Sequence, residues 1–172
     1  VHYAATKESD VEMKPEGLCL ADTGGHYKDG TTDITRTIAL GELSAQEKRD
    51  YTLVLKGHLR LGAAKFLEGV CGQNLDCLAR EPLWENGLDY NHGTGHGVGF
   101  LLSVHEGPQN FRWRIGKDAD CVPLEEGMVI SNEPVRRFTK TGVEITHMHL
   151  PLLLKADTVV FAVGTKPQNE LA

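Results

Sequence analysis

Cysteine, long apolar runs and excess positive charge are scarce in this sequence. Four cysteines in 172 residues, with no C-x-x-C pair, indicate neither a disulfide framework nor a zinc knuckle, so we expect reduced thiols. No apolar run approaches the roughly 18 residues that span a bilayer, and the N-terminus lacks a signal-peptide pattern. A net charge of -6 argues against general binding to nucleic acid or anionic membrane. These absences predict a cytoplasmic protein without either kind of partner.

Two short runs rich in β-branched and apolar residues, 18–22 and 31–38, predict a pair of antiparallel strands. The turn formers GGHYKDG lie between them, so Asp22 and Asp33 would sit on neighbouring strands. Three later apolar runs predict strands of a mixed or antiparallel sheet, at 128–130, 143–154 and 158–163.

A capping box formed by Ser44 and Glu47 predicts the start of a long helix. Apolar positions spaced by three and four residues predict its buried face, and these are Tyr51, Leu55, Leu59, Gly62, Phe66 and Val70. The helix is expected to end near Gly69 or Gly72, where left-handed backbone is available to glycine.

A second, shorter helix is predicted through LDCLAR. Asn74 can cap its start, and Pro82 and the Asn86-Gly87 pair help to end it. The predicted class is therefore α+β. With 40% hydrophobic residues and no repeat or linker, the chain is expected to form one domain over residues 1–172. Its start at Val1-His2-Tyr3 is typical of a strand end and indicates a fragment or a processed chain.

Acidic residues and histidines interrupt stretches that would otherwise be buried strands, at Asp22, Asp33, His96 and Glu133. Taken singly, such an aspartate usually caps a turn and such a histidine is usually a hydrogen-bonded core residue. Several buried carboxylates in one place, however, require a shared cation. Carboxylates with one imidazole suit Mn²⁺, Co²⁺ or Zn²⁺. The histidines of NHGTGHGVG lie among four glycines, which makes a regular helix there improbable.

Three stretches carry a resemblance to a known family: ADTGGHYKDGTTDITRT, LDCLAREPLWENGLDYNHGTGHGVGFLLSVHEGPQNF and LEEGMVISNEP. They resemble the catalytic domain of aminopeptidase P, the Xaa-Pro aminopeptidase. This family belongs to the pita-bread group, with prolidase, methionine aminopeptidase and creatinase. The resemblance implies a curved, mostly antiparallel sheet with flanking helices. It extends from about residue 1 to about residue 163.

The resemblance also implies a site with two divalent ions, often manganese, that share a bridging water or hydroxide. Asp22 would chelate one ion and Asp33 would bridge both. His96 and Glu133 would bind the other ion, and Glu133 would also handle the proton of the attacking water. The implied reaction is hydrolysis of an N-terminal Xaa-Pro bond by metal-bound hydroxide.

Three further histidines match substrate-handling positions of the family. His92 matches a residue that contacts the substrate, and His105 matches one that hydrogen-bonds the scissile carbonyl and the developing tetrahedral intermediate. His2 matches a residue that lines the proline pocket. The remaining histidines match nothing catalytic, and these are His26, His58, His147 and His149.

One ligand position departs from the family pattern. Relatives carry a bridging glutamate where the alignment puts Thr146, and a threonine hydroxyl is a poor ligand for such an ion. The remaining carboxylates then fall one charge short of neutralising two divalent ions. Glu144 lies two residues earlier, so on a strand it faces the same side and is a candidate substitute ligand. The alternative is that Glu144 is solvated or salt-bridged and the metal site is degraded.

The family domain also has a preceding half and a C-terminal helical tail, and neither is in this sequence. A homodimer partner or a further segment is therefore expected to cover the apolar edge. Three functional hypotheses remain. The first is an aminopeptidase acting on peptides with proline in second position. The second is a binding protein that keeps the pita-bread fold and peptide pocket but has lost efficient hydrolysis, and the third is a creatinase-like hydrolase. The quoted stretches favour the aminopeptidase lineage over the third.

Overall fold

The structure is a computed structural model that describes residues 6–10, 12–114, 121–137 and 144–146. Within these ranges every named strand pair is antiparallel: β1 with β2, β3 with β4, and β5 with β6. The α+β class is confirmed. The elements in chain order are β1 (Leu18–Tyr27), β2 (Gly30–Ala39), α1 (Ala45–Gly62), α2 (Gly72–Trp84), β3 (Gly95–His96), β4 (Asn110–Phe111), β5 (Val135–Arg137) and β6 (Glu144–Thr146). The predicted strand at 158–163 and most of that at 143–154 lie outside the described residues.

The β1–β2 hairpin is longer than predicted, because the first strand continues through GGHY and leaves only two residues in the turn. Gly24 permits this: a Cβ there would lie 2.7 Å from the carbonyl oxygen of Thr32. In the register, Asp22 lies opposite Thr35 and Asp33 lies opposite Gly24. Opposed residues share a face, as do alternate residues of one strand, so both aspartates are on the same face of the hairpin.

Helix α1 begins where the capping box predicts. The backbone N–H of Ser44 donates to Oε2 of Glu47 at 2.7 Å, and the N–H of Glu47 donates to Oγ of Ser44 at 3.2 Å. The predicted end near Gly69 or Gly72 is wrong, since the helix ends at Gly62. Phe66 and Val70 still pack on the core, but from the turns that follow. Apolar spacing therefore continued past the end of the helix that it predicted.

The buried face of α1 is also rotated from the predicted one. Leu59, a predicted core position, is 50% exposed. The face that is buried carries Asp50, Leu53, Val54, Gly57, His58 and Leu61. A count of apolar residues does not find this face, because two of its members, Asp50 and His58, are polar. Each is hydrogen-bonded where it is buried, Asp50 to Gln46 of the same helix and His58 to the carbonyl of Asn132.

Helix α2 begins at Gly72, and its N-cap residue, Cys71, lies three residues before the predicted cap Asn74. Asn74 still serves the helix start, because its Oδ1 accepts the backbone N–H of Cys71 at 3.1 Å. The helix ends at Trp84, close to the predicted Pro82 and Asn86-Gly87 signals. The expectation of reduced thiols is wrong for Cys71 and Cys121, which form a disulfide between residues 50 apart. Spacing cannot reveal a pair so distant.

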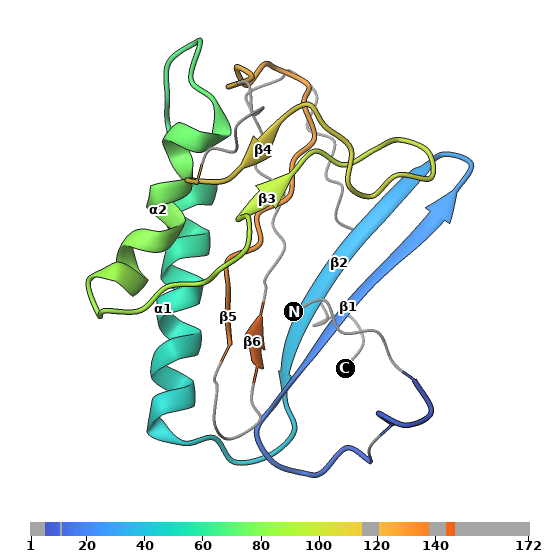
Figure 1. The fold of residues 1–172 in the computed structure, drawn as a ribbon, viewed down its shortest axis with the longest axis vertical. Helices are drawn as coiled ribbons and strands as arrows, with labels where there is room; N and C mark the ends of the chain where they lie inside the picture. Colours follow the sequence, from blue (N-terminus) through green and yellow to red (C-terminus); the bar gives the residue numbers. More distant parts are fainter. Residues whose placement is uncertain (1–5, 11, 115–120, 138–143, 147–172) are drawn as a thin grey trace, which may run out of the picture.

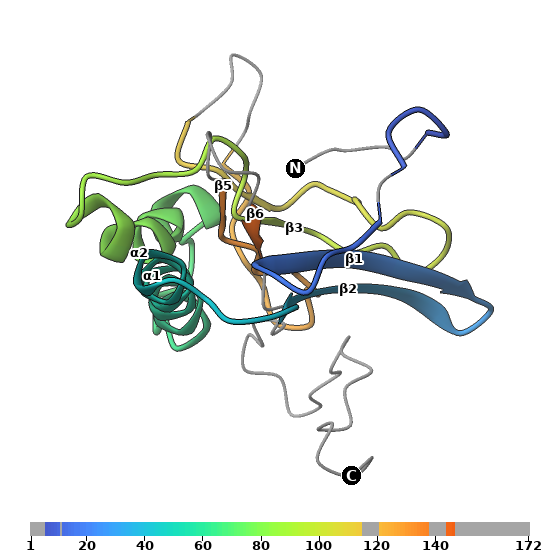
Figure 2. The same cartoon turned by 90° about the horizontal axis from the view of Figure 1, so that it is seen from below.

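The two helices pack on one side of the molecule and the β1–β2 hairpin lies on the other (Figures 1 and 2). Strands β5 and β6 lie between α1 and the hairpin (Figure 1). A first buried cluster joins the helices to the β3–β4 region and comprises Leu61, Leu75, Ala79, Phe111, Leu124 and Ile130. A second comprises Leu53, Val54, Leu83 and Tyr90. Neither helix within the described residues is long and apolar enough to cross a membrane.

Candidate metal centre

The glycine-rich histidine segment contains the two-residue strand β3 and lies between β4 and the segment before β5. Residues of β3 pair with β4 on one side, and on the other side the segment before β5 hydrogen-bonds back to it. The N–H of Ser131 donates to the carbonyl of His96 at 2.8 Å, and the N–H of Glu133 donates to that of Thr94 at 2.5 Å. Gly95 is needed here, because a Cβ would lie 2.1 Å from the carbonyl oxygen of Ser131. The ladder fixes His96 beside Glu133.

Three predicted ligands converge in the structure: Asp33 from β2, His96 from β3 and Glu133 from the segment before β5. One ligand atom from each lies within 4.8 Å of the others. Nε2 of His96 is 2.7 Å from Oε1 of Glu133 and 3.3 Å from Oδ2 of Asp33. Their side chains are 12 to 19% exposed, so the cluster is largely shielded from solvent.

The position of His96 requires a proton or a cation between its ring and the carboxylates of Asp33 and Glu133. Its Nδ1 lies 2.8 Å from the carbonyl oxygen of Gly97, which can only accept, so Nδ1 carries a proton. In the neutral ring the lone pair of Nε2 would face two carboxylate oxygens, which is repulsive unless a proton or a metal ion lies between them. Burial alone would lower the pKa of His96, but hydrogen bonding to Asp33 and Glu133 and the charge of Glu133 raise that pKa to about 10.

This donor set fits a divalent metal ion. Two carboxylates neutralise one M²⁺, and one imidazole with two carboxylates is a combination that suits Mn²⁺, Co²⁺ or Zn²⁺. The bond from Nδ1 of His96 to a backbone carbonyl is the outer contact that orients metal-binding histidines. The residues present therefore fit one ion among Asp33, His96 and Glu133.

Asp22 is not part of this three-residue cluster. It is exposed, and its Oδ1 accepts a hydrogen bond from Oγ1 of Thr35 at 2.6 Å. It shares the hairpin face with Asp33, displaced by two positions along the strand. Its assignment to a second ion stays a prediction.

Three other predicted site residues lie wholly or partly outside what the structure describes. His2 is not among the described residues. Glu144 and Thr146 are described only as backbone of β6, which pairs with β5 and contacts β1 and β2 (Figure 1). The strand that bears Glu144 and Thr146 therefore runs beside the hairpin that carries the aspartates.

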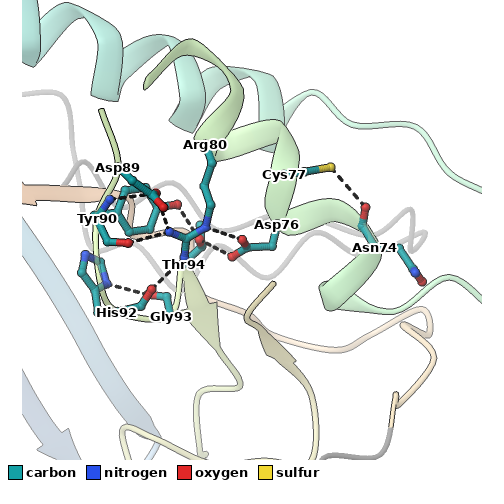
Figure 3. Close-up of polar contacts among 9 residues, drawn as sticks. All are labelled: Asn74, Asp76, Cys77, Arg80, Asp89, Tyr90, His92, Gly93 and Thr94. Atoms are coloured by element: carbon teal, nitrogen blue, oxygen red, sulfur yellow. Dashed lines mark hydrogen bonds and ion pairs between the residues drawn. The ribbon is translucent and has the colours of Figure 1, made fainter. Parts of the chain in front are cut away.

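The two predicted substrate-handling histidines that the structure describes, His92 and His105, differ in their relation to the cluster. The ring of His105 is exposed and contacts that of His96, with ring centroids 4.3 Å apart. The ring of His92 stacks on Tyr90, with centroids 4.7 Å apart, and its Nδ1 donates to the carbonyl of Gly93 at 2.7 Å (Figure 3). His105 thus lies next to His96, a candidate ligand, whereas His92 lies three residues before β3, the strand that bears His96.

Sequence reasoning missed the buried polar residues behind the cluster. Nδ1 of His58 donates to the carbonyl of Asn132 at 3.2 Å, and Nδ2 of Asn132 donates to the carbonyl of His58 at 2.9 Å, which joins α1 to the residue before Glu133. Asp76 and Arg80 form a second buried group with Thr94 (Figure 3). In the sequence, Asp76 and Arg80 are only an acidic and a basic residue four apart on a predicted helix, and this pattern is typical of a solvated pair.

Sequence comparison supplies relatives of this chain. Aminopeptidase P1 of Arabidopsis thaliana is 52% identical over 134 residues, which are 78% of this chain and 20% of that protein. A Fusarium vanettenii protein named "Probable Xaa-Pro aminopeptidase P" is 51% identical over 168 residues, which are 97% of this chain and 26% of that protein. The chain therefore spans about a fifth to a quarter of the length of these relatives.

Solved structures match the fold. The crystal structure of X-prolyl aminopeptidase from Caenorhabditis elegans, a cytosolic enzyme with a di-nuclear active site, has a TM-score of 0.77 and 38% identity over 87% of this chain and 24% of its own. Prolidase from Pyrococcus furiosus has a TM-score of 0.69 and 31% identity over 88% of this chain and 43% of its own. The fold is thus the pita-bread fold, in part. The sequence profile of metallopeptidase family M24 matches residues 1–150, and the chain belongs to that family.

Proposed function

We propose that this protein is a metal-dependent aminopeptidase that hydrolyses the bond between an N-terminal residue and a following proline. The observation that carries the proposal is the convergence of Asp33, His96 and Glu133 within 4.8 Å. The names of the relatives and of the matched structures support the Xaa-Pro substrate class. We further propose that residues 1–172 belong to one catalytic-type domain of a cytoplasmic protein.

A divalent ion bound at these residues, proposed to be Mn²⁺, would supply nucleophilic water near neutral pH. Glu133 is the base that would take the proton of that water, because its carboxylate reaches the centre of the cluster. His105, beside the ring of His96, would donate a hydrogen bond to the substrate carbonyl as negative charge develops on it. His92 and His2 would contact the peptide.

A second ion would draw on Asp22 and Asp33 from the hairpin, with Glu144 in place of the bridging glutamate. The hairpin face shared by the two aspartates supports this arrangement. If Glu144 does not bind metal, the site would hold one ion or none.

The alternative function is that of a peptide- or protein-binding module with impaired hydrolysis. It is supported by the sequence expectation that Thr146, whose hydroxyl is a poor metal ligand, stands where the family carries a bridging glutamate. A site with two carboxylates and one imidazole matches a single divalent ion in charge, and loss of the second ion would remove one of the two groups that act on the scissile carbonyl.

A partner is proposed for the exposed apolar end of the molecule. Four large apolar side chains lie exposed at the hairpin tip and in the loop after β3: Tyr27, Phe100, Leu101 and Leu102. The hydroxyl of Thr31 donates to the carbonyl of Phe100 at 3.3 Å, which holds this loop to the hairpin. A homodimer partner or a further segment would cover these side chains.

The test is metal analysis of the purified protein after Mn²⁺ addition, together with release of the first residue from an Xaa-Pro tripeptide. In the parent protein we expect stoichiometric Mn²⁺ and turnover. Both should be lost in Glu133→Ala, since this change removes a ligand and the base. Glu126→Ala is the matched control, because Glu126 is exposed in the same segment, and it should leave both unchanged. The first residue of a tripeptide with alanine in place of proline should be released more slowly than that of the Xaa-Pro tripeptide.

Peptide binding without bound metal or turnover would overturn the peptidase proposal and favour the binding module. Full turnover in Glu133→Ala would contradict the role of Glu133.

A further inference from the structure

A buried arginine lies behind the candidate site and takes no direct part in it. The side chain of Arg80, on α2, is 1% exposed, and that of its partner Asp76 is fully buried. Nε of Arg80 donates to Oδ2 of Asp76 at 2.5 Å, and Nη1 donates to Oδ1 of Asp89 at 2.8 Å. A buried ion pair recovers little net stability, because both charges lose their hydration. Stability alone is therefore a weak explanation for this group.

The other donors of Arg80 hold the loop that leads into β3. Nη1 donates to the carbonyl of Tyr90 at 2.7 Å, and Nη2 donates to that of His92 at 2.8 Å (Figure 3). The guanidinium carbon also lies 3.9 Å from the centre of the Tyr90 ring. These two carbonyls are two residues apart, and the planar guanidinium fixes both at once. A lysine ammonium lacks this rigid fork.

Asp76 extends the same network to the strand of the metal ligands. Its Oδ1 accepts the hydroxyl of Thr94, so the Thr94 oxygen accepts in turn from the hydroxyl of Tyr90 (Figure 3). The carbonyl of Thr94 receives the N–H of Glu133, and His96 lies two residues further along the strand. A continuous chain of bonds thus runs from Arg80 through Asp76 and Thr94 to the backbone of a candidate ligand.

We propose that Arg80 is a positioning residue of the site, which sets Glu133 and His96 through Asp76 and Thr94 and sets His92 through its carbonyl. The expected effect of Arg80 on turnover rests on the proposed function, whereas its expected effect on metal affinity does not. Replacement of Arg80 should therefore change the metal affinity of protein that remains folded.

The test compares Arg80→Lys with Arg60→Lys. Arg60 is on α1 and pairs with Glu81, with both side chains about half exposed, so the same substitution is made at a buried and a solvated ion pair. Mn²⁺ affinity is measured from the electron paramagnetic resonance signal of free Mn²⁺, well below the melting temperature of each variant. We expect affinity to fall about 10-fold in Arg80→Lys, the lower end of the range for direct outer contacts of metal ligands, because Arg80 acts through Asp76 and Thr94, and to stay unchanged in Arg60→Lys.

A second pair of variants decides the matter even if Arg80→Lys does not fold. Thr94→Val keeps the shape but removes the hydroxyl, so it should weaken Mn²⁺ binding, and Thr94→Ser restores the hydroxyl and should recover it. Where the parent protein turns over, kcat should fall more than KM rises in Arg80→Lys and Thr94→Val. Mn²⁺ affinity within about twofold of the parent in every folded variant of Arg80 and Thr94 would overturn the inference. A parent protein that binds Mn²⁺ without turnover would overturn the proposed function alone.

Discussion

His96 shows how one proton can stand in for a metal ion. In the metal-free protein its pKa is raised to about 10, against 6.5 in the unfolded chain, by the carboxylates of Asp33 and Glu133. A pKa raised on folding stabilises the native state fully below pH 6.5. This contribution falls as the pH rises above 6.5 and is gone above a pH of about 10, where the ring is neutral in both the folded and the unfolded state. Over the neutral range the metal-free site is held together by the proton on Nε2.

Metal binding should therefore release a proton. Mn²⁺ and the proton compete for Nε2 of His96, so at pH 7.5 we expect about one proton released per ion bound, and an affinity that rises with pH up to about 10. Calorimetric titrations in two buffers of different ionisation enthalpy measure this number directly.

The control for this titration is Asp29→Asn, a change in the exposed hairpin turn, which should leave the proton count as it is. Binding heats that do not depend on the buffer would show that His96 is neutral before metal arrives, contrary to the expectation.

The predicted ligands that converge share a sequence signal that the missed residues lack. Asp33, His96 and Glu133 are polar where the pattern asks for an apolar strand residue, so they called for an explanation. Asp76 and Arg80 are polar where a helix surface is expected, and nothing in the sequence shows that the loop of residues 88–94 covers them. Burial of this pair is a tertiary fact, which local periodicity cannot supply.

At the scale of elements, the approach of α1 to α2 depends on a single glycine. A Cβ at Gly57 would lie 2.0 Å from the carbonyl oxygen of Ala79 and 2.9 Å from its carbonyl carbon, which are backbone atoms that cannot rotate away. Gly57→Ala should thus push the helices apart. Overpacking of this kind costs about 3 kcal/mol, and the better helix propensity of alanine returns about 1 kcal/mol. We expect a net loss of about 2 kcal/mol in urea unfolding.

Gly62→Ala, in the same helix, is the matched comparison. A Cβ there meets only Nδ2 of Asn132 at 3.8 Å, an ordinary contact, so this variant should be neutral or more stable by up to about 1 kcal/mol. Equal effects of the two substitutions would show that helix propensity, and not the close approach, governs both.

Elements were predictable where their signal was local. The capping box at Ser44 and Glu47 predicted the start of α1, because both of its bonds form within one turn. The end of α1 and its buried face depended on contacts with distant segments, such as the bond between His58 and Asn132. The hairpin was predicted from its strands and turn formers, yet its length depended on how closely two backbones approach at Gly24.

At the scale of the whole molecule, the candidate metal centre ties together three remote parts of the chain. Asp33 comes from the hairpin, His96 from β3 and Glu133 from the segment that leads into β5. The disulfide within the described residues does not cross-link the hairpin to the other two segments, since it joins residues 71 and 121. An ion held by all three would act as a cross-link that exists only in the folded state.

Mn²⁺ should therefore raise the melting temperature. A ligand at 100 times its dissociation constant stabilises the folded state by about 2.7 kcal/mol, and for a chain of this size that corresponds to roughly 5–10 °C. The shift should grow with the logarithm of Mn²⁺ concentration, disappear with a chelator and be lost in Asp33→Asn. Asp29→Asn should retain the full shift, because it removes one acidic charge from the same hairpin without touching the site. Equal shifts in both variants would mean that Mn²⁺ acts on general surface charge, and the three segments would then share no ion.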